Sequence, residues 1–193
     1  MNCVLFCQLI ADPCMISGGW LLVSNIVIDE SLATPVLSVE TTYHGITSYQ
    51  NNRTVLSKNA MNELRTHMSF TQLRFHCSKR QGRTFHVTTV TNSTGEAVVQ
   101  YFSGQTDVQP GACGSFVKMD DDDSLMSGVC HLWGLEGGAY KVGKWGHDGN
   151  GQKRLYEHPA FVDSLYHWIA SLSMCDDWTA DVSLGDFWKV YVR

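Results

Sequence analysis

The clearest alternation of apolar and polar residues lies between Gln72 and Val90. Every second residue of Gln72–Cys77 is apolar, and the same period of two returns in Arg83–Val90. Such alternation is typical of β-strands with one buried face. Ser78–Gly82, which is basic and ends on glycine, separates the two segments, so the pattern predicts an antiparallel hairpin. Its inward-facing side chains are Leu73, Phe75, Cys77, Phe85 and Val87.

Other segments also have strand character. The apolar, β-branched run Leu21–Ile28 follows a Gly-Gly-Trp tripeptide and predicts a buried strand. Ala97–Phe102 follows the turn residues Asn92–Gly95 and predicts another strand. Phe187–Val192 predicts a last strand that tucks the end of the chain into the sheet. Ser31–Thr54 has no clear period, so we expect loop with one or two short strands.

Two segments have a helical period. Ser57 and Asn59 are good N-cap residues, and the residues that then share one face are Met61, Leu64 and Met68. A second helix is predicted to start at Pro159, because proline suits the first turn of a helix. Its apolar face would consist of Phe161, Leu165, Trp168, Ile169 and Leu172. We expect Cys175–Trp178 to follow as a loop.

The glycine-rich stretch Ser103–Gly151 shows little regular structure. A long loop-rich region inside a compact domain is usually functional. No linker or repeat divides the chain, so we expect one α+β domain over residues 18–193, with a twisted antiparallel sheet and a few short helices. Residues 1–17 contain an apolar run without the basic residues of a signal peptide. We interpret them as an N-terminal segment that is the remnant of a signal or upstream region.

Composition narrows the functional classes. The 193 residues carry a net charge of −5 and no basic patch, so nucleic acid is not an expected partner. Apolar runs are shorter than the roughly 20 residues that a transmembrane helix needs. Seven cysteines and two glycosylation sequons, at Asn52 and Asn92, favour a secreted, disulfide-bonded glycoprotein. The alternative is a reduced cytosolic chain whose cysteines fill the core.

An acidic loop is the first candidate site. Asp120, Asp121, Asp122 and Asp123 are consecutive and lie between Cys113 and Cys130. Ca²⁺ takes six to eight oxygen ligands, and clustered carboxylates supply several of them. We therefore predict calcium as a cofactor here, with a solvated acidic turn as the alternative and Asp107 as a further candidate ligand.

Aromatic residues in the glycine-rich stretch are the second candidate. Sugars pack their CH faces on aromatic rings and bond their hydroxyls to fixed polar groups. The residues that offer such groups are Trp133, Tyr140, Trp145 and His147. The alternative is that these side chains pin long loops to the core.

The histidines do not form a known catalytic or zinc motif. The sequence has no H-E-x-x-H, no G-x-S-x-G and no phosphate-binding loop. His76 and His86 occupy outward positions of the predicted hairpin and are expected to face each other, which by itself does not make a zinc site. We therefore expect a protein that is not an enzyme.

Several motifs resemble the fibrinogen-related domains. Gly18–Val23 resembles the Gly-Gly-Trp opening of that family, and the acidic loop with His131–Gly134 resembles its calcium loop. Asn62–Thr66, Arg74–Lys79 and Gly185–Val190 are similar to cnidarian secreted fibrinogen-like proteins, among them coral skeletal organic matrix proteins. The resemblance covers most of the chain. It implies a fibrinogen C-terminal-like fold with a long loop-rich region for calcium and ligand.

Two disulfides are predicted. Cys113 and Cys130 flank the acidic loop, and a bridge between them would close it and restrict the unfolded chain. Cys77–Cys175 follows as a second pair by elimination. Cys14 is a rival partner for Cys77, because members of the resembled family tie down their N-terminal segment.

These observations predict a secreted, extracellular recognition domain. It would bind carbohydrate or an extracellular protein in a calcium-dependent, lectin-like manner. The alternative is a structural protein of the extracellular or skeletal organic matrix, linked to biomineralisation and without a discrete sugar site. Homo-oligomer formation is left open.

Overall fold

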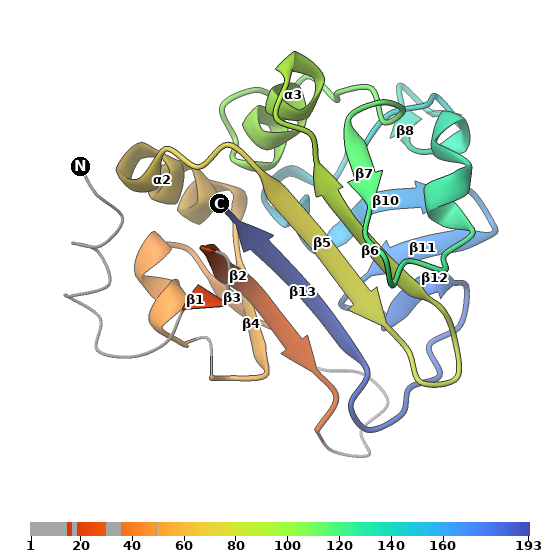
Figure 1. The fold of residues 1–193 in the computed structure, drawn as a ribbon, viewed down its shortest axis with the longest axis horizontal. Helices are drawn as coiled ribbons and strands as arrows, with labels where there is room; N and C mark the ends of the chain where they lie inside the picture. The colour runs from red at the N-terminus through yellow and green to blue at the C-terminus, as the bar shows by residue number, and fades with distance from the viewer. Residues whose placement is uncertain (1–14, 17–18, 30–35, 49) are drawn as a thin grey trace.

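The computed structural model describes residues 15–16, 19–29, 36–48 and 50–193. Most of its strands belong to one large sheet: β1 (Met15–Ile16), β2 (Trp20–Val27), β3 (Ser38–Glu40), β4 (Arg53–Leu56), β5 (Leu73–Ser78), β6 (Thr84–Thr89), β7 (Phe116–Lys118) and β13 (Phe187–Val192). Their order is β3-β4-β2-β13-β5-β6-β7, with β1 paired to β2 (Figure 1). All pairs are antiparallel except β3 with β4, which is parallel.

A second, three-stranded sheet lies behind β5 and β6 in the view of Figure 1. It consists of β10 (Glu157–Val162), β11 (Tyr166–Ile169) and β12 (Met174–Asp177), and β8 (Leu135–Glu136) pairs separately with β9 (Ala139–Tyr140). The helices are α2 (Lys58–Met68) and α3 (Ser93–Phe102), with short 3-10 turns η1 (Tyr43–Ser48), η2 (Met126–Gly128), η3 (Cys130–Leu132) and η4 (Gly151–Lys153). The predicted α+β class is confirmed.

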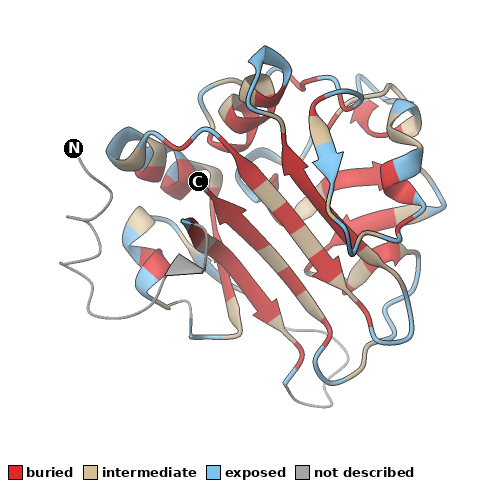
Figure 2. Ribbon diagram, in the orientation of Figure 1, coloured by how far each residue is buried: buried red, intermediate tan, exposed pale blue. Residues whose placement is uncertain are grey.

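The period-two pattern of the sequence produces the large sheet as expected. Buried and half-buried residues alternate along β5, and Figure 2 shows the same banding on the first half of β13, whose last three residues are all buried. The predicted hairpin is β5 and β6, whose residues pair from Arg74 with Thr88 to Ser78 with Thr84. Its inward side chains are fully buried, because the second sheet and the loop region cover that face. The predicted strand over Leu21–Ile28 is confirmed as β2.

The last strand, β13, lies in the middle of the large sheet. It pairs with β2 on one side and with β5 on the other. The backbone amides of Thr71 and Gln72 donate to the carbonyl of Arg193, which fixes the end of the strand. The prediction that the chain end is tucked into the sheet is therefore confirmed.

The first predicted helix is confirmed as α2. Ser57 is its N-cap, and the Ser57 hydroxyl accepts a hydrogen bond from the backbone amide of Ala60. A hydroxyl at this position satisfies one of the free amides of the first turn. Met61 and Leu64 are buried as predicted, whereas Met68 at the last turn is only partly buried.

The prediction of a strand at Ala97–Phe102 is wrong, because this segment belongs to α3. The Asn92 side chain accepts hydrogen bonds from the backbone amides of Thr94 and Gly95 and so starts a helix instead of a hairpin turn. Gly95 allows the first turn to approach β6 closely, since a Cβ there would lie 1.9 Å from the carbonyl oxygen of Val90. The apolar residues also fit a helical period.

The predicted helix from Pro159 is also wrong. Its residues form the hairpin β10–β11, in which Phe161 pairs with His167. The turn contains Ser164 at φ 58°, and Leu165 is 49% exposed, so the supposed apolar face does not exist. The expected loop Cys175–Trp178 is largely strand β12, paired to β11. Tertiary pairing here outweighs a helical spacing of apolar residues.

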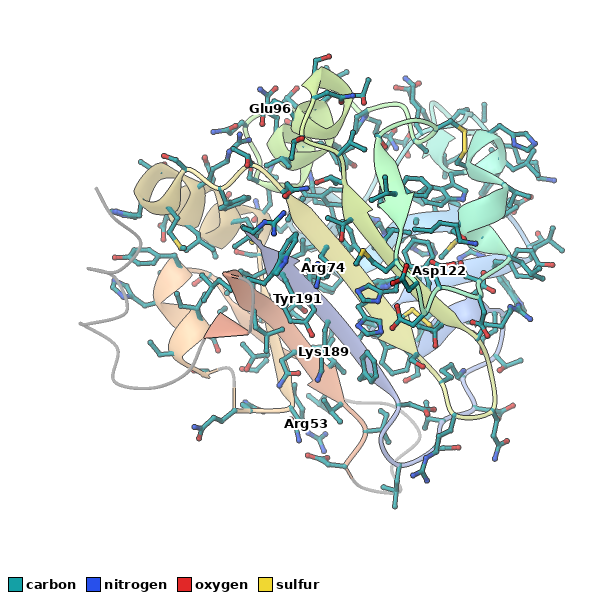
Figure 3. The ribbon with its side chains drawn as sticks, in the orientation of Figure 1. Arg53, Arg74, Glu96, Asp122, Lys189 and Tyr191 are labelled. Carbon is teal, nitrogen blue, oxygen red and sulfur yellow. A yellow bond between two sulfur atoms is a disulfide. The ribbon has the colours of Figure 1, made fainter. Side chains whose placement is uncertain are left out.

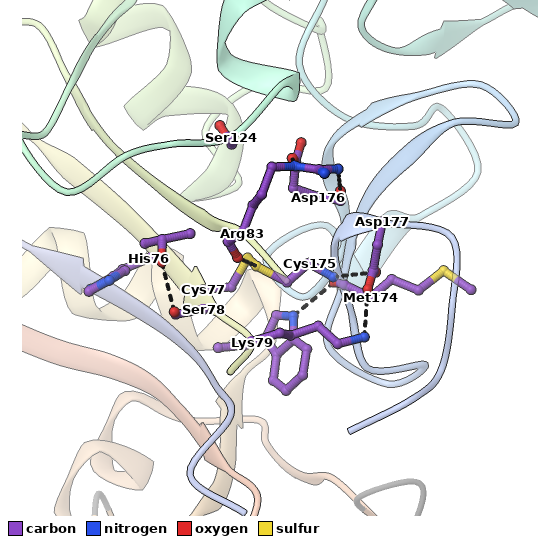
Figure 4. The surroundings of a disulfide bond; sticks show 12 residues. His76, Cys77, Ser78, Lys79, Arg83, Ser124, Met174, Cys175, Asp176 and Asp177 are labelled. Atoms are coloured by element: carbon purple, nitrogen blue, oxygen red, sulfur yellow. Dashed lines mark hydrogen bonds and ion pairs between the residues drawn. A yellow bond between two sulfur atoms is a disulfide. The ribbon is translucent and has the colours of Figure 1, made fainter. Parts of the chain in front are cut away.

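The two sheets are joined by a disulfide between Cys77 of β5 and Cys175 of β12, with a Cα–Cα distance of 5.9 Å. Figure 4 shows that charged side chains surround it. Asp176, next to Cys175, is fully buried and pairs with the guanidinium of Arg83. Its carboxylate also accepts hydrogen bonds from the backbone amides of Leu125 and Met126. Asp176 therefore ties β12, β6 and the acidic-loop region together.

Replacement of Asp176 by asparagine is expected to reduce the free energy of unfolding by about 1.5–3 kcal/mol, because it weakens the charge-assisted hydrogen bonds that the buried carboxylate accepts from Arg83 and from two backbone amides. Asparagine also tolerates the φ of 53° at this position. Urea unfolding measures the change. The matched control is Asp181→Asn, which removes a carboxylate from an exposed position. Equal stability of Asp176→Asn and the control would contradict the structural role of Asp176.

Candidate functional site

The four carboxylates of the acidic loop have different partners. Asp122 accepts hydrogen bonds from the backbone amide of His86 and from the hydroxyls of Ser124 and Ser127. Asp123 accepts one from the backbone amide of Thr84. These contacts extend the edge of β6 into the loop. Two of the predicted calcium ligands are thus already bonded to protein donors.

Asp121 points toward two histidines. Its Oδ1 lies 2.5 Å from Nδ1 of His86, and its Oδ2 lies 3.6 Å from Nε2 of His76. Asp120 is exposed. The loop therefore does not bring its four carboxylates to one position. Within the described part of the chain, the one group of three or more side chains with metal-ligand atoms close together is His76, His86 and Asp121.

The disulfide between Cys113 and Cys130 closes the acidic loop, as predicted, with a Cα–Cα distance of 5.2 Å. The prediction that Cys77 pairs with Cys175 is likewise confirmed. Its rival partner, Cys14, lies outside the described residues, as do Cys3 and Cys7.

The aromatic candidates of the glycine-rich stretch divide into two groups. Trp133 and Trp145 are fully buried, and their indole NH groups donate to the carbonyl of Met126 and the hydroxyl of Ser115. The two indole rings contact each other edge to face, with their centroids 4.9 Å apart, and they hold the loops on the core. Tyr140 is 51% exposed, and His147 is half-buried beside Asp148. The structure therefore does not bring the four together as one binding surface.

A polar pocket of about 170 Å³ lies between the β5–β6 turn and the chain after β12. Its lining is Lys79, Gln81, Gly82, Asp177, Thr179, Asp181, Val182, Ser183 and Asp186. No local pattern of the sequence indicates this pocket, because its two walls are far apart in the sequence. The disulfide holds them together: Cys77 lies two residues before Lys79, and Cys175 lies two residues before Asp177 (Figure 4).

Lys79 organises one side of this pocket. Its ammonium group donates to Asp177 Oδ2 at 2.6 Å and to the carbonyl oxygens of Ser173 and Thr179 at 3.0 and 3.1 Å. The side chain is almost fully buried, and all three of its donors are used. The buried ammonium group of Lys79 thus binds three oxygen atoms of the chain segment that forms the other wall of the pocket.

A second histidine cluster lies on the three-stranded sheet. The ring of His158 is 5.6 Å from that of His147 and 5.1 Å from that of His167, and Trp178 packs on His167 at 4.4 Å. Burial lowers the pKa of His158 and of His167 to about 4, and a neighbouring histidine adds to each shift. Both rings are therefore neutral at pH 7.

The two sequons differ in their surroundings. Asn92 is exposed at the start of α3. Asn52 is half-buried, and its Nδ2 donates to Asp29 Oδ2 at 2.9 Å. Glycosylation takes place on this nitrogen, so a glycan at Asn52 would replace that hydrogen bond. Modification of both residues stays a prediction, and Asn92 is the more accessible.

Comparison with known proteins identifies no relative: no protein-family model, no curated protein and no solved structure matches the chain. No helix of the described residues is long and apolar enough to cross a membrane. The function must be inferred from the geometry of the molecule.

The second histidine cluster generates a pH prediction. An unfolded histidine takes up a proton below about pH 6.5, whereas His158 and His167 in the folded protein do so only near pH 4. The unfolded state therefore binds more protons between these values, and stability falls as the pH decreases through this window. Unfolding midpoints in urea measure the loss.

The variant His158→Asn should flatten this pH dependence, because it removes one of the shifted groups and asparagine tolerates the φ of 47°. The quantity compared is the slope of the unfolding midpoint against pH, so a loss of stability that is equal at every pH does not affect the comparison. His44→Asn, at an exposed histidine, is the control. The same slope in all three proteins would show that the cluster is not responsible.

Proposed function

We propose that this chain is a secreted, non-enzymatic recognition domain that binds carbohydrate or an extracellular protein at the polar pocket between the β5–β6 turn and residues 177–186. The observation that carries the proposal is the disulfide between Cys77 and Cys175, which holds the two walls of that pocket. Both cysteines are fully buried. A structural disulfide of this kind forms and persists in an oxidising compartment, such as the extracellular space.

The chemistry of the pocket suits a ligand rich in hydroxyl groups. Gln81, Thr179 and Asp181 are exposed polar residues of its lining. Asp177 and Asp186 are held in place by hydrogen bonds from Lys79 and from the backbone amides of Arg80 and Ser183. A wall fixed in this way loses little conformational freedom when a ligand binds. Sugar sites use such preorganised polar groups.

Membership of the fibrinogen-related class is part of the proposal. Its support is the α+β architecture, the Gly-Gly-Trp entry to β2 and the disulfide-closed acidic loop. Calcium at Asp120–Asp123 has narrower support, since Asp122 and Asp123 already accept protein hydrogen bonds. An ion would need to use the exposed Asp120 and backbone or water oxygens as well.

Binding to a glycan array tests the proposal, with and without EDTA. We expect specific binding that Asp181→Asn weakens at least about tenfold, because a hydrogen bond to a charged group contributes about 1.5–3 kcal/mol. Asp163→Asn, outside the pocket, is the matched control.

Tyr140→Ala tests the exposed ring of the glycine-rich stretch as the rival surface. Selective adsorption to carbonate without glycan binding would instead favour the matrix role.

Thermal unfolding with Ca²⁺, and with Mg²⁺ as the control, tests the calcium part separately. A ligand of the folded state stabilises it by about 2.7 kcal/mol at 100 times its dissociation constant. We expect an increase in Tm that is specific for Ca²⁺. An unchanged Tm would remove calcium from the proposal and leave the pocket as a metal-independent site.

A further inference from the structure

Two imidazole rings lie side by side on the outer face of the large sheet. His76 of β5 is the direct cross-strand partner of His86 of β6. Their rings are stacked, with centroids 3.7 Å apart and planes 2° from parallel. In Figure 1 no other labelled helix or strand crosses this face in front of β5 and β13. Strand pairing thus fixes two metal-ligand side chains side by side, with His76 partly exposed and His86 buried.

The acidic loop supplies a third ligand. The Asp121 carboxylate lies beside one ring nitrogen of each histidine, and one ligand atom from each of the three residues lies within 4.8 Å of the others. Ligands of a tetrahedral zinc ion lie at about 2.0–2.2 Å from the metal, and hence roughly 3.4 Å from one another. To bind one ion, the two imidazole rings would turn out of their parallel stack, so that their nitrogen lone pairs converge. The loop itself is anchored beside them, because Asp122 accepts the backbone amide hydrogen of His86.

His86 also has an unused ligand atom. The residue is 8% exposed, and its Nε2 is buried without a hydrogen-bond partner. Buried polar atoms in native proteins are nearly always satisfied, so such an atom calls for an explanation.

The surrounding charges are mixed. Lys189 of β13 is the cross-strand neighbour of His76, and Arg74 lies on the same outer face (Figure 3). The Arg74 guanidinium packs over the ring of Trp20 at 4.1 Å. Asp121 and Asp122 contribute negative charge on the β6 side of the histidine pair, opposite Lys189 on the β13 side.

We propose that His76, His86 and Asp121 bind a divalent transition-metal ion of the zinc class, with water in the open coordination positions. Two imidazole nitrogens and one carboxylate suit zinc, copper or nickel. Calcium and magnesium take oxygen ligands instead, so this site differs in chemistry from the calcium proposed for the same loop. It is also independent of the polar pocket.

Titration calorimetry with Zn²⁺ on the full chain tests the proposal. We expect one ion per chain and a dissociation constant that rises at least about tenfold in Asp121→Asn and in His76→Gln. Even the residues that support a metal ligand typically change affinity by about 10–100-fold. Asp120→Asn makes the same charge change one residue away, and His44→Gln removes an exposed histidine. Both controls should bind within about twofold of the unaltered protein.

Co²⁺ provides a second readout, because its visible absorption depends on the ligand set. The unaltered protein should show a spectrum that Asp121→Asn and His76→Gln lack. Unfolding without metal shows whether each variant is folded. No binding by the unaltered protein, or equal binding by Asp121→Asn and Asp120→Asn, would overturn the proposal. Loss in His44→Gln alone would place the ion elsewhere and overturn it as well.

Discussion

The large sheet depends on the central position of β13. This strand is the last of the chain, and it pairs with β2 near one end of the sequence and with β5 in its first half. Without it, the β1–β4 part and the β5–β7 part have no shared hydrogen bonds in the sheet order. Such pairing closes long loops, which is entropically costly and slow to form. The joining of the two parts of the sheet therefore depends on contacts between residues that are far apart in the sequence.

The second constraint is the link between the two sheets. Cys77 on β5 lies opposite Trp188 on β13, and it is bonded to Cys175 on β12. The indole NH of Trp188 on β13 donates to the carbonyl of Met174 on β12, so a hydrogen bond also links the two sheets beside the disulfide. The polar pocket forms two residues beyond each cysteine. Its geometry thus follows from the way the two sheets are linked, and hydrogen bonds from Lys79, Arg80 and Ser183 fix part of its polar lining.

The acidic loop shows how one sequence feature divides among several roles. Asp122 and Asp123 continue the hydrogen bonding of β6 at the sheet edge. Asp121 turns to the histidine pair on the outer face. Four equal side chains in the sequence therefore have unequal environments. The run of four carboxylates in the sequence predicts a bound ion. In the structure, protein hydrogen-bond donors already occupy Asp122 and Asp123, and this decides which carboxylates remain available to bind one.

Local patterns of the sequence are sufficient for the α+β class, the hairpin β5–β6, the strands β2 and β13 and the helix α2, because period and capping are local properties. The sequence also predicts both disulfides, but it leaves Cys14 as a rival partner for Cys77, and the structure pairs Cys77 with Cys175. The sequence did not determine that Ala97–Phe102 is helical or that the segment after Pro159 is a hairpin. In those segments, a side-chain cap and long-range strand pairing outweigh local appearance. Trp133 and Trp145 are core residues because their rings pack against Phe116 of β7. The pocket and the cluster with Asp121 each combine residues from distant segments, so only the tertiary structure could reveal them.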